Sequence, residues 1–378
     1  MRHKFLILVI LILIFIVVHS TEAQIIFGQK GYFSSSVIYT GWNIKGTEEV
    51  NLHEWVGVVR VFLPLSDNFE LSYFSTGAAT NLTHSSSSRK KLSGVNDARI
   101  QGAYSFLDDA FLLTLGVNIP TGKKSLTTDE IEVANMLADN SMRFPVRRYG
   151  EGLNFSTGLV FAKKIGGLIF GLGGGYLLNG KYALLASTSD KYKPGDETSL
   201  SIGVDMKRVN TLLRFDGTYT HFSQEKFGGV KAFQKGSMGE ISALLNHSRA
   251  RTSFYLSVNA IFRGKDRLLN ESGFSYEYYN SHGNEYRGDL SANYVLTNSL
   301  GLRGFFEIRS VAANKYPSND PFFVGASHFY GGGAGCDFKI IPKITLNLSA
   351  KYFAGKTNGN KDDLRGVNAE AGLTFGFK

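Results

Sequence analysis

Hydrophobic and polar residues alternate along most of the chain. In the stretch "DARIQGAYSF" (97–106), Asp97 and Arg99 fall on one face, whereas Ile100 and Tyr104 fall on the other. A period of two residues is that of a β-strand with two unlike faces. The same alternation recurs at 212–219, 289–296, 302–309 and 367–377. The pattern therefore predicts an all-β protein.

The connections between these strands alternate as well, between short and long. Short links are expected near Ser66, Asp108, Ile165, Arg208, Ser248, Asn298 and Pro342. Long polar segments are expected at 77–93, 120–148, 179–196, 221–236, 264–283, 311–326 and 354–365, with a shorter loop at 44–51. We predict a transmembrane antiparallel up-and-down β-barrel of about 16 strands, within a range of about 12 to 16, with short periplasmic turns and long extracellular loops.

A soluble β-sandwich is the alternative, because its strands alternate in the same way. A sandwich buries large apolar residues and exposes a charged surface. Here the apolar face is rich in Gly, Ala, Leu and aromatic residues, and the chain contains 43 Gly. Aromatic residues near strand ends suit the headgroup level of a bilayer. We place there Trp42, Trp55, Tyr73, Phe106, Phe111 and Tyr352. The membrane barrel is therefore the favoured fold.

The N-terminus has the pattern of a secretory signal peptide over 1–23. A basic start is followed by an apolar run at 5–18 and by small residues that end at Ala23. We expect cleavage between Ala23 and Gln24, which leaves 24–378 as a single barrel domain. This export signal and the barrel pattern together predict an integral protein of the cell outer membrane in a Gram-negative bacterium.

The charge of the chain bears on its partners. The formal net charge is +9, but the Lys and Arg residues are scattered and form no compact basic stripe, so no nucleic-acid partner is expected. The expected partners are outer-membrane lipids and lipopolysaccharide, the barrel assembly machinery and a small-molecule solute. Outer-membrane barrels usually end on an aromatic residue that this machinery reads, and here Phe377 is next to last.

The third long loop, 120–148, is the one loop whose sequence predicts a helix. Thr127 and Glu130 have the spacing of a capping box, and apolar residues follow at helical spacing. We predict a short amphipathic helix at about 128–139. Two positions stay open for this loop: it folds into the barrel lumen, or it lies across the outer rim.

Charged residues occupy the face of the strands that is predicted to point inward. A charge facing lipid at the bilayer midplane costs about 2 to 4 kcal/mol for Arg or Lys, which strongly favours the inward direction. The candidate lumen and selectivity residues are Arg60, Asp97, Arg99, Arg214, Asp216, Arg263, Arg287, Asp289, Arg303, Glu307, Arg309 and Glu370, and Asp205 and Lys351 share their direction. These residues either select a solute that passes through, or form a salt-bridged filling that makes the barrel rigid.

The sequence holds little that indicates catalysis. It has no His-Glu-x-x-His motif, no Cys pair and no Gly-rich phosphate loop, so no metal, no cofactor and no enzymatic activity are expected. His221 and Ser223 lie two residues apart and therefore on one face of a strand. A lipid hydrolase at the rim that uses this pair is the enzymatic alternative.

One stretch also resembles a known family. Its sequence is "GVNDARIQGAYSFLDDAFLLTLGVNIPTGK" (94–123), with the motif residues Gly94, Asp97, Asp108, Pro120, Thr121 and Gly122, and it is followed by "LTTDE" and by "YGEGLN" (149–154). This pattern resembles the outer-membrane transporters of the meta-pathway of phenol degradation, and more loosely the long-chain fatty-acid transporters of the outer membrane.

The resemblance implies a barrel and the passage of hydrophobic or aromatic compounds. We therefore expect an outer-membrane channel or transporter for the passive passage of small molecules, including hydrophobic or aromatic ones. A barrel that does not conduct and has a structural or interaction role is the second alternative, beside the rim hydrolase.

Overall fold

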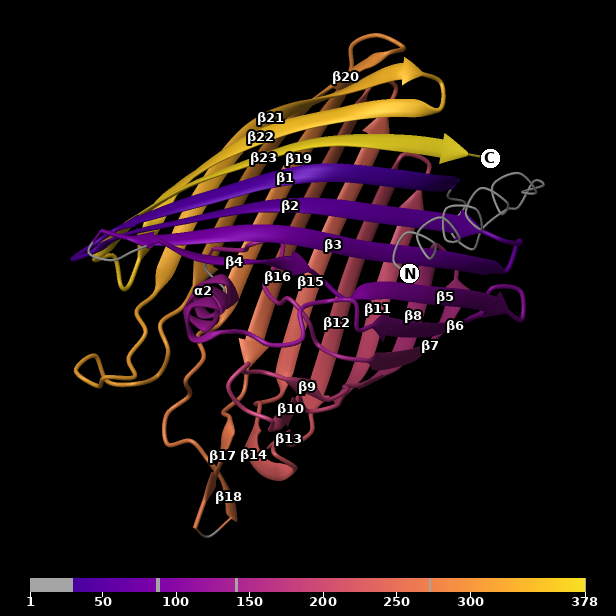
Figure 1. The fold of residues 1–378 in the computed structure, drawn as a ribbon. Helices are drawn as coiled ribbons and strands as arrows, with labels where there is room; N and C mark the ends of the chain where they lie inside the picture. Colours follow the sequence, from indigo (N-terminus) through magenta and orange to yellow (C-terminus); the bar gives the residue numbers. More distant parts are fainter. Residues whose placement is uncertain (1–29, 86–88, 140–141, 272, 378) are drawn as a thin grey trace, which may run out of the picture.

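A computed structural model describes residues 30–85, 89–139, 142–271 and 273–377. The predicted signal peptide and its cleavage site lie outside these residues. Within them the chain forms one closed antiparallel barrel and a smaller sheet at one of its ends (Figure 1). No helix of the described part of the chain is long and apolar enough to cross a membrane.

The barrel wall consists of 17 strand segments, and two of them, β4 and β5, form a single broken strand because both pair with β3. The barrel therefore has 16 strands, which confirms the predicted fold class. In the first half they are β1 (Gly31–Lys45), β2 (Glu49–Pro64), β3 (Phe69–His84), β4 (Lys90–Val95), β5 (Ala98–Phe106), β6 (Phe111–Ile119), β7 (Asn154–Ile165) and β8 (Leu168–Leu178). In the second half they are β11 (Glu197–Arg208), β12 (Thr211–Phe222), β15 (Met238–Arg249), β16 (Thr252–Arg263), β19 (Glu285–Val295), β20 (Leu300–Val311), β21 (Ser327–Ile341), β22 (Ile344–Thr357) and β23 (Asp362–Phe377).

The first and last strands close the barrel. β1 pairs with β23 over its full length, from Gly31 opposite Phe377 to Lys45 opposite Asp363. Each strand pairs with its sequence neighbours in the antiparallel direction, so the backbone N–H and C=O groups of the wall bond to each other. A closed ladder of this kind is required in hydrocarbon, where no water is present to satisfy a free strand edge.

The short links lie where the sequence predicts them, but several outer loops are shorter than expected. β3 continues to His84 and β4 begins at Lys90, so most of the expected loop at 77–93 is strand. Likewise, only 46–48 and 358–361 separate β1 from β2 and β22 from β23. These strands run past the predicted length because they continue to pair with each other up to the rim.

The small sheet at the outer rim was not predicted from the sequence. It consists of six short strands, β9 (Tyr182–Ala183), β10 (Lys191–Lys193), β13 (Glu225–Phe227), β14 (Val230–Gln234), β17 (Arg267–Asn270) and β18 (Gly273–Tyr276). They come from three long loops and extend beyond the barrel strands in Figure 1. Strands of two to five residues are too short for the alternation of polar and apolar residues to reveal them.

The outer face of the barrel is apolar, as the alternation predicts. Large apolar side chains are exposed there, including Val37, Trp55, Tyr104, Leu200, Ile202, Phe215, Ile241, Leu290, Phe306 and Leu373. One placement was wrong: Trp42 was expected among the headgroups, but it is only 3% exposed and stacks against Phe353 inside the barrel. Its position two residues from the inward-facing Thr40 fixes that direction.

The third long loop contains the single helix of the described residues, α2 (Thr128–Ala138). It begins where the capping box predicts it: the Thr127 hydroxyl accepts a bond from the Glu130 N–H at 3.4 Å, and Glu130 Oε2 accepts one from the Thr127 N–H at 3.0 Å. Val133 and Leu137 of α2 are fully buried. Figure 1 shows the helix next to β4.

We predict that the substitution Leu137→Ala loosens this loop without opening the barrel. Loss of a fully buried leucine costs about 2 to 5 kcal/mol of packing, and here that packing holds the loop and not the strand ladder. Hydrogen exchange of 128–139 should become faster, while the barrel should keep its resistance to unfolding in detergent. Val209→Ala, at a turn residue that is 100% exposed, is the matched control and should change neither.

Candidate functional site

The site begins at a break in the barrel wall between β4 and β5. Gly77 of β3 faces Val95, whereas Phe74 faces Arg99, so the register shifts by one residue between the two segments. Asn96 and Asp97 form this break, and the Asn96 N–H still bonds to the Thr76 carbonyl at 2.7 Å. β5 has β6 as its second partner, but no strand of the described residues pairs with the second edge of β4.

Residues 120–153 leave β6 and return to β7 at this break, and we call them the inserted segment. Asp97 holds both of its ends, because its two carboxylate oxygens accept bonds from the backbone N–H groups of Gly122 at 2.8 Å and Glu151 at 2.7 Å. The Thr121 hydroxyl adds a third link: it donates to the Asn96 carbonyl at 3.1 Å and accepts from the Ala98 N–H at 2.9 Å.

Two glycines allow the ends of the inserted segment to approach each other. A Cβ on Gly122 would lie 2.5 Å from the Tyr149 carbonyl oxygen, and one on Gly150 would lie 2.1 Å from the carbonyl oxygen of Lys123. Both distances are far below contact distance, so only glycine fits. Asp97, Thr121 and Gly122 of the motif therefore meet the stretch 149–154 in space and anchor the inserted segment at the break, whereas Asp108 lies apart in the β5–β6 turn.

The inserted segment lies inside the barrel. Its buried side chains Val133, Leu137, Met142, Phe144, Val146 and Tyr149 form one apolar cluster with strand residues that include Trp42, Leu52, Val56, Ala78 and Phe353. These strand residues share the inward direction of β1, β2, β3 and β22. Of the two positions left open by the sequence, the loop therefore takes the one within the lumen.

A buried carboxylate that the sequence reasoning missed fastens this packing. Glu54 of β2 is fully buried, and its two oxygens accept bonds from the Thr80 hydroxyl and from the Val146 N–H, both at 3.3 Å. The Thr80 hydroxyl also bonds to the Tyr149 hydroxyl at 2.9 Å. The inward direction of Glu54 can be predicted from the sequence, because Glu54 lies an even number of residues from Arg60 and so points to the same side of β2.

The inserted segment divides the space inside the barrel. A cavity of about 610 Å³ lies along the inner face of β12, β15, β16, β19 and β20, and a second cavity of about 760 Å³ lies near the strand break, next to Arg99 and Asn118. Arg143 and Arg147 of the inserted segment line both cavities. The part of the inserted segment that carries these two arginines is therefore the partition between them.

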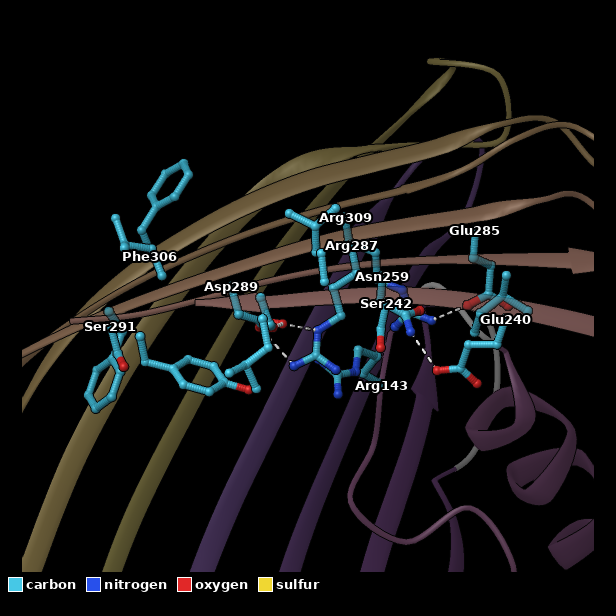
Figure 2. Close-up of a pocket in the computed structure, with 18 of the residues that line it drawn as sticks. Arg143, Glu240, Ser242, Asn259, Glu285, Arg287, Asp289, Ser291, Phe306 and Arg309 are labelled. Atoms are coloured by element: carbon cyan, nitrogen blue, oxygen red, sulfur yellow. Dashed lines mark hydrogen bonds and ion pairs between the residues drawn. The ribbon is translucent and has the colours of Figure 1, made fainter. Parts of the chain in front are cut away.

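The larger group of charges lies in the first cavity. Glu307 of β20 is near three cations: Arg143 Nη1 at 2.9 Å, Arg287 Nε at 3.9 Å and Lys351 Nζ at 3.7 Å. Glu285 pairs with Arg263 at 2.5 Å and with Arg309 at 2.9 Å. Figure 2 shows Arg143 beside Arg287, with Phe306 pointing away from them.

The remaining predicted residues also lie on the inner face, in separate groups. Arg287 pairs with Asp289 at 2.6 Å, and Arg214 pairs with Asp205 at 2.6 Å. Arg60, Arg303 and Glu370 line a small cavity of about 190 Å³, and Arg303 also pairs with Asp337 at 3.0 Å.

Arg99 bonds to Gln101 at 2.9 Å. Asp216 accepts a long bond of 3.5 Å from the Ser242 hydroxyl. Asp97 differs from all of these, since its carboxylate binds backbone N–H groups and not a cation.

The structure does not bring His221 and Ser223 together. His221 Nδ1 lies 3.4 Å from the Ser237 hydroxyl, while the Ser223 hydroxyl accepts a bond from the Asp196 N–H at 2.7 Å. No third group that would orient the imidazole of His221 bonds to it among the described residues, so a catalytic triad is not assembled there. The described residues also hold no group of three or more potential metal ligands.

Comparison with known proteins supports the fold. No protein-family model matches the sequence, and no curated protein matches it. The chain is similar to the TodX deltaS2S3 mutant monoaromatic hydrocarbon channel, with a TM-score of 0.50 at 12% identity over 93% of this chain and 92% of that one. It is also similar to a Pseudomonas aeruginosa FadL homologue (TM-score 0.46, 10% identity, 93% and 92% covered) and to the CymD monoaromatic hydrocarbon channel (TM-score 0.43, 10% identity, 93% and 90% covered).

Of these three structures, the TodX channel bears on the fold of the protein. At 12% identity the likeness to the TodX channel shows a shared fold and nothing further. The chain forms a closed 16-stranded barrel with an inserted segment inside it, and its fold is similar to that of the TodX channel.

The substitution Asp97→Asn should release the ends of the inserted segment. The amide oxygen of the asparagine can still accept a hydrogen bond from one of the two N–H groups, of Gly122 or Glu151, but its NH2 group then faces the other N–H group. We therefore expect the anchor to weaken by about 1 to 3 kcal/mol. Limited proteolysis should then cut within 120–153 more rapidly, while the barrel remains intact. Asp190→Asn, in an outer loop, is the control. Equal cleavage of the two variants would contradict the anchoring role.

Proposed function

We propose that the protein is a channel of the outer membrane through which small molecules, including hydrophobic or aromatic ones, diffuse down a gradient. The observation that carries this proposal is the pair of cavities inside the barrel, of about 610 and 760 Å³, which meet at Arg143 and Arg147. Both volumes are in the range of about 300 to 1,000 Å³ that is usual for small-molecule sites. The inserted segment would set the width of the path, and the inward charges would set its selectivity.

The proposed location and partners follow from the outer surface of the barrel. An apolar outer face on a closed ladder suits the hydrocarbon of a bilayer. We propose that the protein is exported by its signal peptide, is assembled by the barrel machinery, and is surrounded by outer-membrane lipids and lipopolysaccharide. Membership of the family of transporters of the phenol meta-pathway is also a proposal, supported by the motif of 94–123 and by the anchoring role of its residues.

A barrel that does not conduct is the second candidate function. The observations that favour it are the ion pairs of Glu307 and Glu285 and the apolar cluster of the inserted segment, which fill part of the lumen. In that case the barrel would act as a rigid scaffold for its outer loops, including the small sheet at the rim.

Reconstitution separates these two functions. We expect the purified protein to conduct KCl in a planar bilayer, and we expect liposomes that contain it to swell in arabinose and in a neutral phenyl glucoside, neither of which crosses lipid readily. If it neither conducts nor causes swelling, the channel is ruled out and the scaffold is favoured.

Shortening the inserted segment should widen the channel. The Lys123 N–H bonds to the Tyr149 carbonyl at 2.6 Å, so a short Gly-Ser linker can replace 125–147 and leave the anchor in place. Because this removes the partition with Arg143, we expect a severalfold higher single-channel conductance. A control variant shortened in the β13–β14 hairpin, which belongs to the small sheet, should keep the original conductance. An unchanged conductance after removal of the partition would show that the path runs elsewhere.

A further inference from the structure

The first cavity has a buried arginine with a free donor. Arg309 of β20 is only 5% exposed and lines this cavity. Its Nη2 donates to Glu285 Oε2 at 2.9 Å, but its Nη1 is buried and has no hydrogen-bond partner among the described residues. A buried donor without a partner costs about 1 to 3 kcal/mol, so an oxygen ligand that reached this group would recover that energy.

The surroundings of Arg309 contain more cations than carboxylates. Glu307 is shared by Arg143, Arg287 and Lys351, and Glu285 is shared by Arg263 and Arg309. Asp289 is the only further carboxylate that pairs with any of these five cations among the described residues. We call Arg143, Arg263, Arg287, Arg309 and Lys351 the cationic wall.

Two further acids line the same cavity, and one of them lies beside the cationic wall. Asp216 and Glu240 lie on β12 and β15, where Ser242 and Asn259 donate to them, and no cation pairs with either among the described residues. The cationic wall lies on β16, β19, β20 and β22 and on the inserted segment. Glu240 faces Ile261, two residues from Arg263, so the wall has five cations beside four carboxylates, which are Glu240, Glu285, Asp289 and Glu307.

The chemistry of the wall indicates what it would bind. Guanidinium groups present several N–H donors in one plane and match the two oxygens of a carboxylate, and such charge-assisted bonds are about twice as strong as neutral ones. Tyr255 and Leu244 also line the cavity and provide an apolar surface for a small carbon skeleton. The cavity thus combines an anion site with room for the rest of a small organic acid.

We propose that the cationic wall binds the carboxylate of small organic acids that pass through the barrel, with Arg143 of the inserted segment completing the site. This inference rests on the proposed channel function and names the class of its solute. A site of this kind must hold the solute weakly enough to release it, as conduction requires. Glu307 and Glu285 each contact more than one cation of the wall. A bound carboxylate competes with these two side chains for the same N–H donors, and this competition keeps its binding weak.

Equilibrium binding to the full-length barrel in detergent tests the inference, with benzoate as the probe and benzamide as its neutral counterpart. We expect saturable binding of benzoate and at least about tenfold weaker binding of benzamide, because the amide carries no charge for the wall. The substitution Arg143→Gln should weaken benzoate binding about tenfold, the value of one charge-assisted hydrogen bond. It changes the inserted segment and not the strand ladder, so the barrel should fold.

Two further variants complete the experiment. Arg309→Lys keeps a cation opposite Glu285 but removes the free Nη1 donor, and it should also weaken benzoate binding. Arg251→Gln, in the β15–β16 turn and not among the residues that line the cavity, should bind benzoate as the unmodified protein does. Equal affinity for benzoate and benzamide, or equal affinity of the Arg143→Gln and Arg251→Gln variants, would overturn the inference.

The outcome also separates this inference from the proposed channel. A barrel that conducts and passes arabinose but does not prefer benzoate to benzamide would remain a channel and would overturn the carboxylate site. A barrel that binds benzoate through Arg143 but conducts nothing would support the site and overturn passage through it.

Discussion

Closure of the backbone ladder is the constraint on which the rest of this structure depends. In hydrocarbon a free N–H or C=O group costs several kcal/mol, so a sheet can cross a bilayer only if its first and last strands meet. Here β1 and β23 meet along their whole length, and within the described residues the strands between them are paired on both sides except at the second edge of β4. At that place the inserted segment returns to the wall, with α2 beside β4.

The break in the fourth strand therefore determines the inside of the barrel as well as its wall. The register shift lies at Asn96 and Asp97, and the side-chain carboxylate of Asp97 binds both ends of the inserted segment. With its ends held there, the segment buries its apolar side chains against the inner face of β1, β2 and β3 and against Phe353 of β22. A register shift of one residue in the wall is thus linked to the partition of the lumen through the two hydrogen bonds that backbone N–H groups donate to Asp97.

The sequence predicted those features that depend on the period of a strand, and missed those that depend on packing. Alternation gave the barrel class, the short turns and the inward direction of residues such as Arg287 and Glu307, because a strand has only two faces. Trp42 was predicted to lie among the headgroups because tryptophan is common there. Its position in the alternation instead pointed inward, and the alternation proved the stronger constraint.

The position of the inserted segment could not be derived in this way. A capping box and an apolar stripe predict that a helix forms, but they do not say which surface will cover it. The answer depended on Leu52, Val56 and Ala78, which are apolar residues on an inner face that also carries many charged side chains. Such residues on the polar face of a membrane barrel indicate that something packs there, and Glu54 in the same row of β2 indicates that the partner supplies a hydrogen-bond donor.

The partition and the cationic wall are physically linked by one residue. Arg143 belongs to the cationic wall and to the inserted segment, lines both cavities and pairs with Glu307 of β20. Any movement of the inserted segment toward or away from the strands must therefore change the width of the lumen and the number of cations around Glu307 together. If the proposed site binds a carboxylate that draws Arg143 away from Glu307, a contact between the partition and β20 is weakened, and occupancy of the proposed site would then be coupled to the opening of the proposed path.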